Sequence, residues 1–286
     1  MGSRIEHQMI ELYCVVDEFL KQHPALAPWR HSPHAQPPFS DAEVLTIALV
    51  QGVLEVASRK QTYRLVAQNW RSAFPRLPSY KQGLTRGHHL LPQVGRLLAT
   101  TCCHTAQATR LYLIDSNPIP LCLPLRHGRV RVLREHGAYF GKTSKGWFFG
   151  FKLHLLRHID GRVLNIVLTP GNCDDRLPAL LLVQAVDGGV TLGDLGYRGP
   201  DCAAALADEA AMLLLTREQA PAHRFVLSQV RQQVETTFSQ LWRKFIDRVF
   251  SRSWVGLWNT LQLKVLYYNL RHAGALAHIG KWMEFV

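Results

Sequence analysis

Three acidic residues stand where carboxylates could perform metal-dependent chemistry: Asp115, Asp194 and Glu235. Asp115 closes the apolar run 111–114, and Asp194 closes a second run, 190–193. Continuously apolar runs of this length are typical of central strands that are buried on both faces. A carboxylate at the edge of apolar packing is costly unless it is solvated, hydrogen-bonded, paired or bound to a metal. A bound cation would offset that cost.

The residue types indicate which chemistry such a site would perform. Hard Mg²⁺ prefers carboxylate oxygens, so three acids suffice to hold two ions, and Mn²⁺ is expected to substitute. Two divalent ions about 3.5 to 4 Å apart can activate a water or sugar hydroxyl on one side of a phosphodiester and stabilise the leaving oxyanion on the other. We therefore expect phosphodiester chemistry that needs no small-molecule cofactor.

The distribution of charge indicates a polyanionic partner. The formal net charge is +12 over 286 residues. Residues 1–125 carry +4, residues 126–160 carry +6, residues 161–223 carry −4, and residues 224–286 carry +6. Two strongly basic segments thus flank an acidic one, which suits a nucleic acid that is gripped on either side of a metal site. Basic surfaces that merely aid solubility are the alternative.

The first hundred residues read as helical, and we expect an N-terminal DNA-binding domain over residues 1–105. Residues 4–22 carry an amphipathic stripe, and a connector with five prolines follows at 23–39. A capping box, Ser40-Asp41-Ala42-Glu43, precedes a helix expected over 44–57. Further helical patterns cover 61–74 and 83–103. The sequence does not identify which of these helices reads DNA.

Residues 106–286 carry the strand patterns and form the expected catalytic domain. After the Asp115 strand, an Asp160-Gly161 turn joins strands 148–158 and 162–169. A helix at 175–186, the Asp194 strand, a helix at 200–209 and a strand at 211–215 follow. The helix 225–250 carries Glu235 beside its apolar stripe, and a helical region at 254–276 is expected to brace the domain. This βββαβαβα order, with its acids, predicts an α/β fold with an RNase H-like mixed sheet.

Each acid also has a simpler structural interpretation. Asp115 before Ser-Asn-Pro could form an Asx-turn, and Asp194 before Leu-Gly could cap a turn. Glu235 could pair with Arg231 on a surface helix, which contributes only about 0.2 to 0.5 kcal/mol. Asp174 and Asp175 are expected to cap the helix that follows them. Taken together with the topology and the charge segregation, the three acids favour catalysis.

The positively charged residues around these strands are candidates for DNA contact. Lys152 and His154 share one face of their strand and are expected to line the active-site face and touch DNA, with a solvent-facing strand edge as the alternative. The arginines after the first strand are expected to contact phosphates, although a solvated loop would look the same. The DNA-binding candidates are Arg126, Arg129, Arg131, Arg134, Lys142, Lys152, His154, Arg198, Arg231 and Lys244.

Over about residues 40–270 the sequence also resembles a known family, the DDE transposases of small bacterial insertion sequences. Five motifs in a fixed order carry the resemblance. They are Leu113-Ile114-Asp115-Ser116-Asn117-Pro118-Ile119-Pro120, Gly150-Phe151-Lys152-Leu153-His154, Leu168-Thr169-Pro170-Gly171-Asn172-Cys173-Asp174-Asp175-Arg176, Gly193-Asp194-Leu195-Gly196-Tyr197, and Arg231-Gln232-Gln233-Val234-Glu235-Thr236-Thr237-Phe238-Ser239-Gln240-Leu241.

The resemblance implies that Asp115, Asp194 and Glu235 are the metal-binding triad and that the reaction is DNA strand cleavage and transfer. It also implies double-stranded DNA as the partner, both the terminal inverted repeats of the element and its target, and a homodimer that joins two ends. A structure-specific nuclease without joining activity, or a non-catalytic DNA-binding protein derived from a transposase, is the alternative. All three acids are present, which argues against the second of these.

The sequence departs from the family at the last helix. Many insertion-sequence transposases have a Tyr, Arg, Glu, Lys signature there, and Arg231 and Glu235 match its spacing. Ser228 occupies the position of the tyrosine and Trp242 that of the lysine, with Lys244 two residues later. Lys244 projects roughly opposite Glu235 at about 100° per residue. The sequence therefore does not determine which residues of this helix contact DNA.

The cysteines and the hydropathy predict the compartment. The six cysteines form no CxxC pair and no regular disulfide-like framework, so reduced thiols are expected. No signal peptide opens the chain, and no apolar stretch reaches the roughly 20 residues that span a bilayer. We expect a cytoplasmic protein without a membrane partner.

Overall fold

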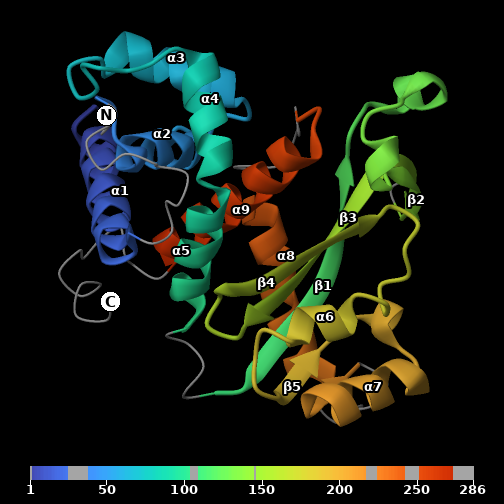
Figure 1. Ribbon diagram of the computed structural model, residues 1–286. Coiled ribbons are helices and arrows are strands. Elements are labelled where there is room, and N and C mark those ends of the chain that lie inside the picture. The colour runs from blue at the N-terminus through green and yellow to red at the C-terminus, as the bar shows by residue number, and fades with distance from the viewer. Residues whose placement is uncertain are drawn as a thin grey trace. The chain divides into compact units, whose positions relative to one another are not determined.

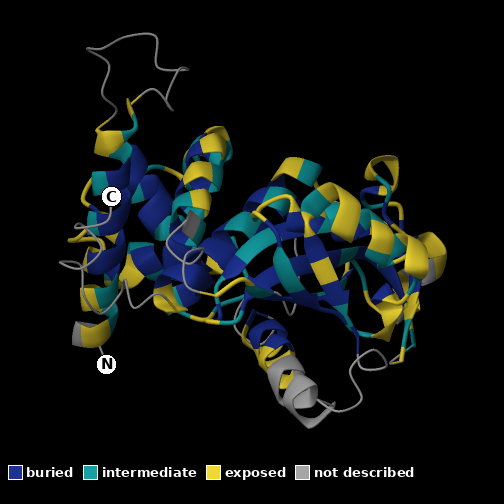
Figure 2. Cartoon of the chain, turned by 90° about the horizontal axis from the view of Figure 1, so that it is seen from below, coloured by how far each residue is buried: buried dark blue, intermediate teal, exposed yellow. Residues whose placement is uncertain are grey.

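A computed structural model describes residues 2–24, 38–103, 109–144, 146–216, 224–241 and 251–272. The chain divides into two compact units. The helical unit comprises residues 1–101, 243–247 and 255–286, and the sheet unit comprises residues 102–242 and 248–254. Figure 1 labels the elements of both, and Figure 2 shows that the buried residues are concentrated inside each unit. None of the helices in the part of the chain described here is long and apolar enough to cross a membrane.

The helical unit is built from helices that differ in how much of their surface is buried, from α4 with no buried residue to α9 with most of its residues buried. They are α1 (Gly2–Gln22), α2 (Asp41–Val53), α3 (Arg59–Asn69), α4 (Tyr80–His89), α5 (Leu91–Cys103), and α9 (Trp254–His272). The predicted capping box is confirmed, because Ser40 Oγ accepts from the amide of Glu43 while the Glu43 carboxylate accepts from the amide of Ser40. The predicted single helix over 83–103 is wrong, since α4 ends at His89 and α5 begins at Leu91. The proline-rich connector lies largely outside the described residues.

The helix α9 is buried along most of its length, with almost every residue from Gly256 to Leu270 shielded from solvent. All but its first residue belongs to the helical unit, whereas the sequence analysis assigned the C-terminal helices to the catalytic domain. It packs tightly on α2, because a Cβ placed on Gly52 would lie 2.4 Å from the Tyr267 ring. Apolar periodicity shows that such a helix is buried but not which partner buries it.

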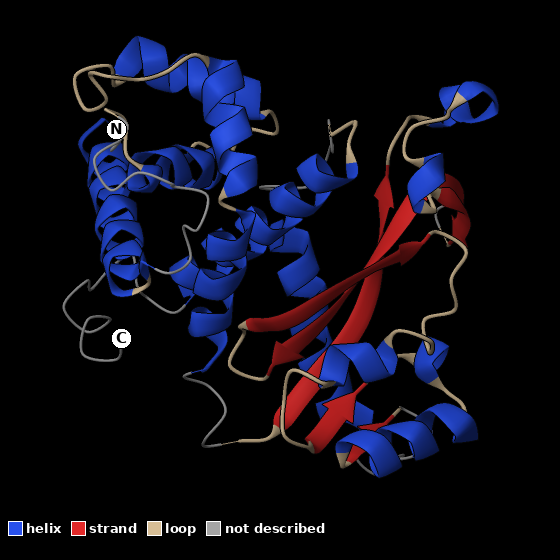
Figure 3. Ribbon diagram, in the orientation of Figure 1, coloured by secondary structure: helices blue, strands red, loops and turns tan. Residues whose placement is uncertain are grey.

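The sheet unit contains a six-stranded mixed sheet in the order β2-β3-β1-β5-β6, with β4 also paired to β3 (Figures 1 and 3). Strand β1 pairs antiparallel with β3 and parallel with β5, and β5 pairs parallel with β6. The first half of β3 pairs with β2 and the second half with β4 along the same edge. The strands are β1 (Leu111–Pro120), β2 (Tyr139–Thr143), β3 (Gly146–His158), β4 (Val163–Pro170), β5 (Gly189–Leu192) and β6 (Met212–Leu215).

Helices cover both faces of this sheet, which explains the continuous apolar runs. On one face, α6 (Ala179–Val183) and α7 (Pro200–Ala210) enclose a core that includes Tyr112, Ile114 and Leu156. On the other face, α8 (Arg224–Leu241) packs against β1 and accepts a hydrogen bond from Arg157 of β3 through Gln233. Short 3-10 helices complete the unit: η2 (Pro124–Arg129), η3 (Arg134–His136) and η4 (Leu195–Tyr197).

The predicted element order is largely confirmed, with two differences. The Asp160-Gly161 hairpin and the strands that carry Asp115 and Asp194 are present. Strand β2 was not predicted, because the run 139–143 is short and contains a glycine and a lysine. The predicted helix 175–186 is only α6, one turn and a half long. The mixed α/β class predicted from the sequence is confirmed.

Candidate active site

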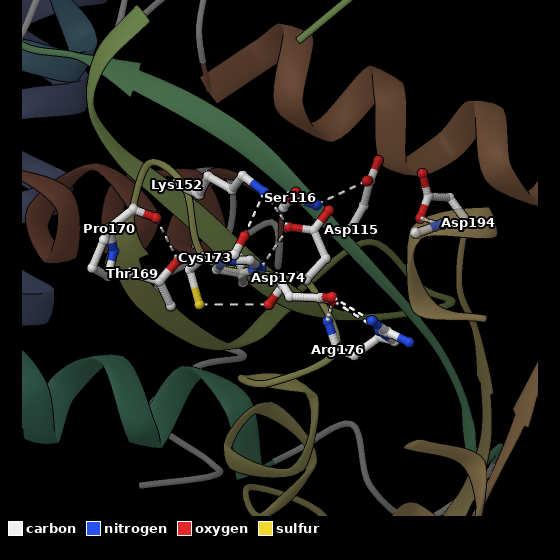
Figure 4. Close-up of polar contacts among 12 residues, drawn as sticks. Asp115, Ser116, Lys152, Thr169, Pro170, Cys173, Asp174, Arg176 and Asp194 are labelled. Carbon is white, nitrogen blue, oxygen red and sulfur yellow. Dashed lines mark hydrogen bonds and ion pairs between the residues drawn. The ribbon is translucent and has the colours of Figure 1, made fainter. Parts of the chain in front are cut away.

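Asp115 lies within β1, and Asp194 lies two residues beyond the end of the neighbouring strand β5. The parallel register pairs Leu113 of β1 with Leu192 of β5. Two residues further along both strands, the same register brings Asp115 beside Asp194, on strands that are about 4.8 Å apart. Figure 4 shows the two carboxylates next to each other. The pairing of β1 with β5 ends just before them, so both side chains are partly exposed.

Each of these carboxylates is oriented by a backbone amide. The amide of Ser116 donates to Asp115 Oδ1 at 2.8 Å, and the amide of Gly196 donates to Asp194 Oδ1 at 2.8 Å. Asp194 is the N-cap of η4, so the predicted turn-capping role is real. The sequence predicted that Asp115 ends its strand. In the structure, β1 instead continues to Pro120 in register with β3. The amides hold both acids in place without supplying a positive charge.

A third carboxylate, Asp175, approaches Asp194 from the segment between β4 and α6. A Cβ placed on Gly196 would lie 2.9 Å from Asp194 Oδ1 and 3.2 Å from Asp175 Oδ2, so both carboxylates lie against the Gly196 Cα. Only glycine leaves that space. Burial raises the pKa of the Tyr197 phenol well above its usual value, and the charges of Asp175, Asp115 and Asp194 raise it further. Tyr197 is fully buried, and its hydroxyl has no hydrogen-bond partner among the described residues. The electrostatic influence of all three acids on this neutral phenol shows that they lie near it.

Asp175 is paired with the positive charge of Lys152. The Lys152 Nζ donates to Asp175 Oδ1 at 2.9 Å and to the Cys173 carbonyl at 2.7 Å (Figure 4 shows Lys152 and Cys173). The His154 ring is close to this ion pair, with its Nδ1 3.9 Å from Asp175 Oδ1 and its Nε2 2.8 Å from Thr169 Oγ1. Burial lowers the pKa of His154 to about 4, which Asp175 opposes and Lys152 reinforces. His154 is therefore neutral near pH 7.

The predicted DNA contact of Lys152 stays a prediction, whereas the predicted contact of His154 and the predicted helix capping by Asp174 and Asp175 differ from the structure. The register pairs Asp115 with Leu155, so Lys152 and His154 project from the opposite face of the sheet to Asp115. His154 is also 0% exposed and cannot touch DNA in this structure. Neither Asp174 nor Asp175 caps α6, whose N-cap is Pro178 without a side-chain bond. Asp174 instead pairs with Arg176, which lowers the pKa of Asp174 to about 2.

The third predicted acid, Glu235, lies on α8. The helix is held on the sheet by the buried side chains of Val234, Phe238 and Leu241, and Glu235 itself is exposed. Across the described ranges, no three acidic, histidine or cysteine side chains lie close enough together to hold a metal ion. The structure thus brings Asp115, Asp194 and Asp175 near one another and places Glu235 on the helix that packs against β1.

Asp175 and Tyr197 were missed as parts of the site. Both fall inside motifs quoted from the sequence, but their roles depend on contacts between segments that are 19 or more residues apart.

The predicted DNA-binding residues differ in their exposure. Exposed residues are Arg126, Arg129, Arg131, Arg134, Lys142 and Arg198. The side chain of Arg231 and all of Lys244 lie outside the described residues.

Comparison with known families decides the identity of the chain. The family model described as "Transposase DDE domain" matches residues 105–250, slightly more than half of the chain. The chain belongs to the DDE transposase family. The matched segment of this DDE transposase includes β1, β5 and α8, and therefore Asp115, Asp194 and Glu235. Searches of curated proteins and of solved structures gave no match.

Membership of the family gives the general function. A DDE transposase is an enzyme of DNA transposition, its partner is DNA, and such domains generally use divalent metals. The resemblance noted from the sequence is therefore confirmed at the level of the family.

The five cysteines of this transposase whose side chains are described carry free thiols.

Proposed function

We propose that this DDE transposase cleaves DNA at the ends of an insertion sequence and transfers the freed strand ends into target DNA. The observation that carries the proposal is that the Asp115 and Asp194 carboxylates lie next to each other, two residues beyond the last pair of the β1–β5 ladder. Both are partly exposed, both are oriented by amides, and both lie near a third acid. Two adjacent carboxylates repel each other, and a shared cation would relieve that repulsion.

The donor set fits hard divalent cations. Asp115 and Asp194 would hold Mg²⁺, or Mn²⁺ in its place, and Glu235 would complete the set from α8. When bound, such ions supply Lewis-acid stabilisation of the developing charge and lower the pKa of an attacking hydroxyl. Two ions correspond to the three carboxylates. Tyr197 is buried near the acids and its phenol is neutral, so it adds no charge to the site.

The reaction consists of two displacements at phosphorus. In the first, water attacks a phosphodiester at the element end, one P–O bond forms as another breaks, and a 3′-hydroxyl is released. In the second, that hydroxyl attacks a target phosphodiester, so the number of phosphodiester bonds is conserved. Asp115 and Asp194 are partly exposed, so a DNA strand can reach them.

Basic residues of the sheet unit would hold the DNA backbone. The exposed arginines of η2, Arg126 and Arg129, together with Arg131 and Arg134, present positive charge that can neutralise phosphates. The helical N-terminal part is proposed to bind the terminal inverted repeats. A homodimer is proposed because transposition must hold two element ends together.

The test of the proposal is the variant Asp194→Asn, which removes one charge and keeps the shape. We expect cleavage of DNA bearing the terminal repeats to fall on the order of 10³-fold, because several kcal/mol of transition-state stabilisation are lost. DNA binding should stay within about threefold. Asp208→Asn, an exposed acid on α7, is the matched control and should cleave normally. Normal cleavage by Asp194→Asn would remove the triad assignment.

Two further assays separate the remaining alternatives. A nuclease without joining activity would cleave but not transfer, so a pre-cut 3′ end offered with target DNA should give joined product only for a transposase. A non-catalytic DNA-binding protein would show no turnover at any concentration of Mg²⁺ or Mn²⁺. We expect joined product in the first assay and metal-dependent cleavage in the second.

A further inference from the structure

An exposed tryptophan stands on the hairpin that β2 and β3 form. Trp147 is 61% exposed, although an aromatic side chain of this size contributes most when it is buried in a core or an interface. The next two residues of β3, Phe148 and Phe149, are both buried. The Trp147 ring is therefore the large apolar surface of this hairpin that is available to a partner.

The ring lies beyond the part of β3 that β1 covers. The last pair of β1 and β3 joins Pro120 to Gly150, and Trp147 lies three residues further towards the start of β3. Among the described strands, β3 pairs there with β2 alone, and the register places Trp147 opposite Lys142. Figure 1 shows this hairpin at the end of the sheet far from α7. The end of the hairpin is thus a two-stranded ribbon that carries the ring.

Positive charge accompanies the ring. Side chains that stand opposite each other in an antiparallel pair share a face, so Lys142 and Trp147 lie on the same face of the hairpin. The Lys142 Nζ lies 5.8 Å from the centroid of the Trp147 ring, and the Arg134 guanidinium carbon lies 5.5 Å from that of Phe149. Residues 137–159 contain no Asp or Glu. No acidic residue of the hairpin therefore neutralises these cations.

An exposed aromatic ring beside a cation is the combination that binds single-stranded nucleic acid. The face of a base stacks on the ring, and the phosphates on either side of that base attract the cation. Lys142 approaches one face of the indole, and the exposure of Trp147 leaves area for a base. Inside a duplex both faces of a base are already stacked on its neighbours, so an unpaired base is the one that fits.

The charge distinguishes DNA from a protein as the partner. An exposed tryptophan can also be the anchor of a protein interface. Charged residues are depleted from the centre of such interfaces, however, whereas a basic surface attracts a polyanion. The Lys142 ammonium next to the Trp147 ring therefore favours DNA.

We propose that Trp147 and Lys142 form a binding site for an unpaired nucleotide of the DNA substrate. The Trp147 ring stacks on the base, and the Lys142 ammonium binds an adjacent phosphate. This inference deepens the proposed function and rests on its DNA substrate.

The register gives the distance of this site from the acids. Asp115 pairs with Leu155, and Trp147 is eight residues from Leu155 along β3. At about 3.3 Å per residue this separation is about 26 Å, which corresponds to roughly eight stacked nucleotides of 3.4 Å. The nucleotide that stacks on Trp147 is therefore remote from the phosphodiester that reacts.

The test measures binding of a labelled DNA single strand of about 16 nucleotides to the full-length protein by fluorescence anisotropy. Trp147→Ala should weaken binding by about 5- to 150-fold, the loss typical of one base stacked on an aromatic ring. Trp147→Phe keeps a ring and should recover most of that loss. Tyr139→Ala removes an exposed aromatic side chain from the opposite face of the same hairpin, so this matched control should bind like the wild type.

A duplex closed by a loop at each end shows which part of the nucleotide the ring contacts. Trp147→Ala should bind this duplex as tightly as the wild type, because the paired bases are stacked on one another. Lys142→Gln should lower the slope of log affinity for the single strand against log salt by about 0.7, because one phosphate contact is lost.

Two results would overturn the proposal. One is equal binding of the single strand by the wild type and Trp147→Ala, which is also the result expected if the ring serves a protein partner. The other is an equal loss of affinity for the single strand and the closed duplex. Thermal unfolding checks that the variants fold, and because Trp147 is mostly exposed its replacement should change the midpoint little.

These binding measurements do not require DNA cleavage. The variant Asp194→Asn should therefore bind the single strand like the wild type while it fails to cleave. Binding of the single strand that depends on Trp147, together with an absence of strand transfer, would support this site and contradict the proposed reaction. Normal strand transfer with binding that does not depend on Trp147 would contradict this site alone.

Discussion

At the scale of single residues, the site depends on how like charges are kept together. Asp175 and Asp194 approach the same glycine, Gly196, and only Asp175 has an ammonium partner, Lys152. Both side chains of this pair are about one-fifth exposed, so their attraction is only partly screened by solvent. Lys152 therefore acts as a positioning residue, because it allows a third carboxylate to stand beside the proposed metal ligands.

This pairing predicts energetic coupling between Lys152 and Asp175. Lys152→Met should lower the free energy of unfolding by about 1 to 3 kcal/mol, because it leaves a partly buried carboxylate near Asp194 without its charged hydrogen bond. Asp175→Asn in the same background should recover part of that loss. Urea unfolding of the two single variants and the double variant measures the coupling, and strictly additive losses would contradict it.

At the scale of secondary-structure elements, close approaches decide how the helices of the helical unit pack. Gly52 lets α2 lie directly against the Tyr267 ring of α9. Gly95 of α5 has open space, since a Cβ there would meet only Gln262 Nε2 at 3.7 Å. The two glycines therefore differ in their effect. Gly52 permits a close contact between two helices, whereas Gly95 only weakens its own helix.

The contrast predicts opposite effects of one chemical change. Gly52→Ala should destabilise the protein by about 1 to 3 kcal/mol, because the added methyl overlaps an aromatic ring. Gly95→Ala should stabilise it by about 0.5 to 1 kcal/mol, because alanine favours a helix over glycine. Thermal or urea unfolding of both variants is the measurement. A stabilising Gly52→Ala would show that α2 and α9 do not pack as described.

At the scale of the whole molecule, the net charge of +12 is concentrated in particular segments. The arginines of η2 are exposed, and Arg126 and Arg129 form no ion pair among the described residues. Arg176, by contrast, is paired with Asp174. Exposed cations of the first kind are available to phosphates, whereas those of the second kind are already neutralised.

This difference predicts the salt dependence of DNA binding. Arg126→Gln and Arg129→Gln should each reduce the slope of log affinity against log salt by about 1, because each removes one phosphate contact. Arg176→Gln should leave the slope unchanged. Binding titrations of a duplex between about 50 and 200 mM salt give the slopes. Equal slopes for all three variants would assign the DNA contacts to other residues.

The sequence alone determined the properties that depend on local order along the chain. The apolar runs before Asp115 and Asp194 predicted two buried strands, one that contains Asp115 and one that ends just before Asp194. The Asp160-Gly161 turn predicted the hairpin, and Ser40 with Glu43 predicted a helix start. The order of the five motifs carried the resemblance to the family, and the charge counts indicated a polyanionic partner. These signals are local because burial, capping and turn formation depend on neighbouring residues.

The tertiary structure alone decided which segments meet. Strand pairing put Lys152 and His154 on the face opposite to Asp115, and a segment between β4 and α6 brought Asp175 beside Asp194. Packing placed α9 in the helical unit, where Lys264 is buried near Arg59. Periodicity reports that a side chain is buried or exposed, but register and long-range packing choose its neighbours, and the chemistry of a site belongs to those neighbours.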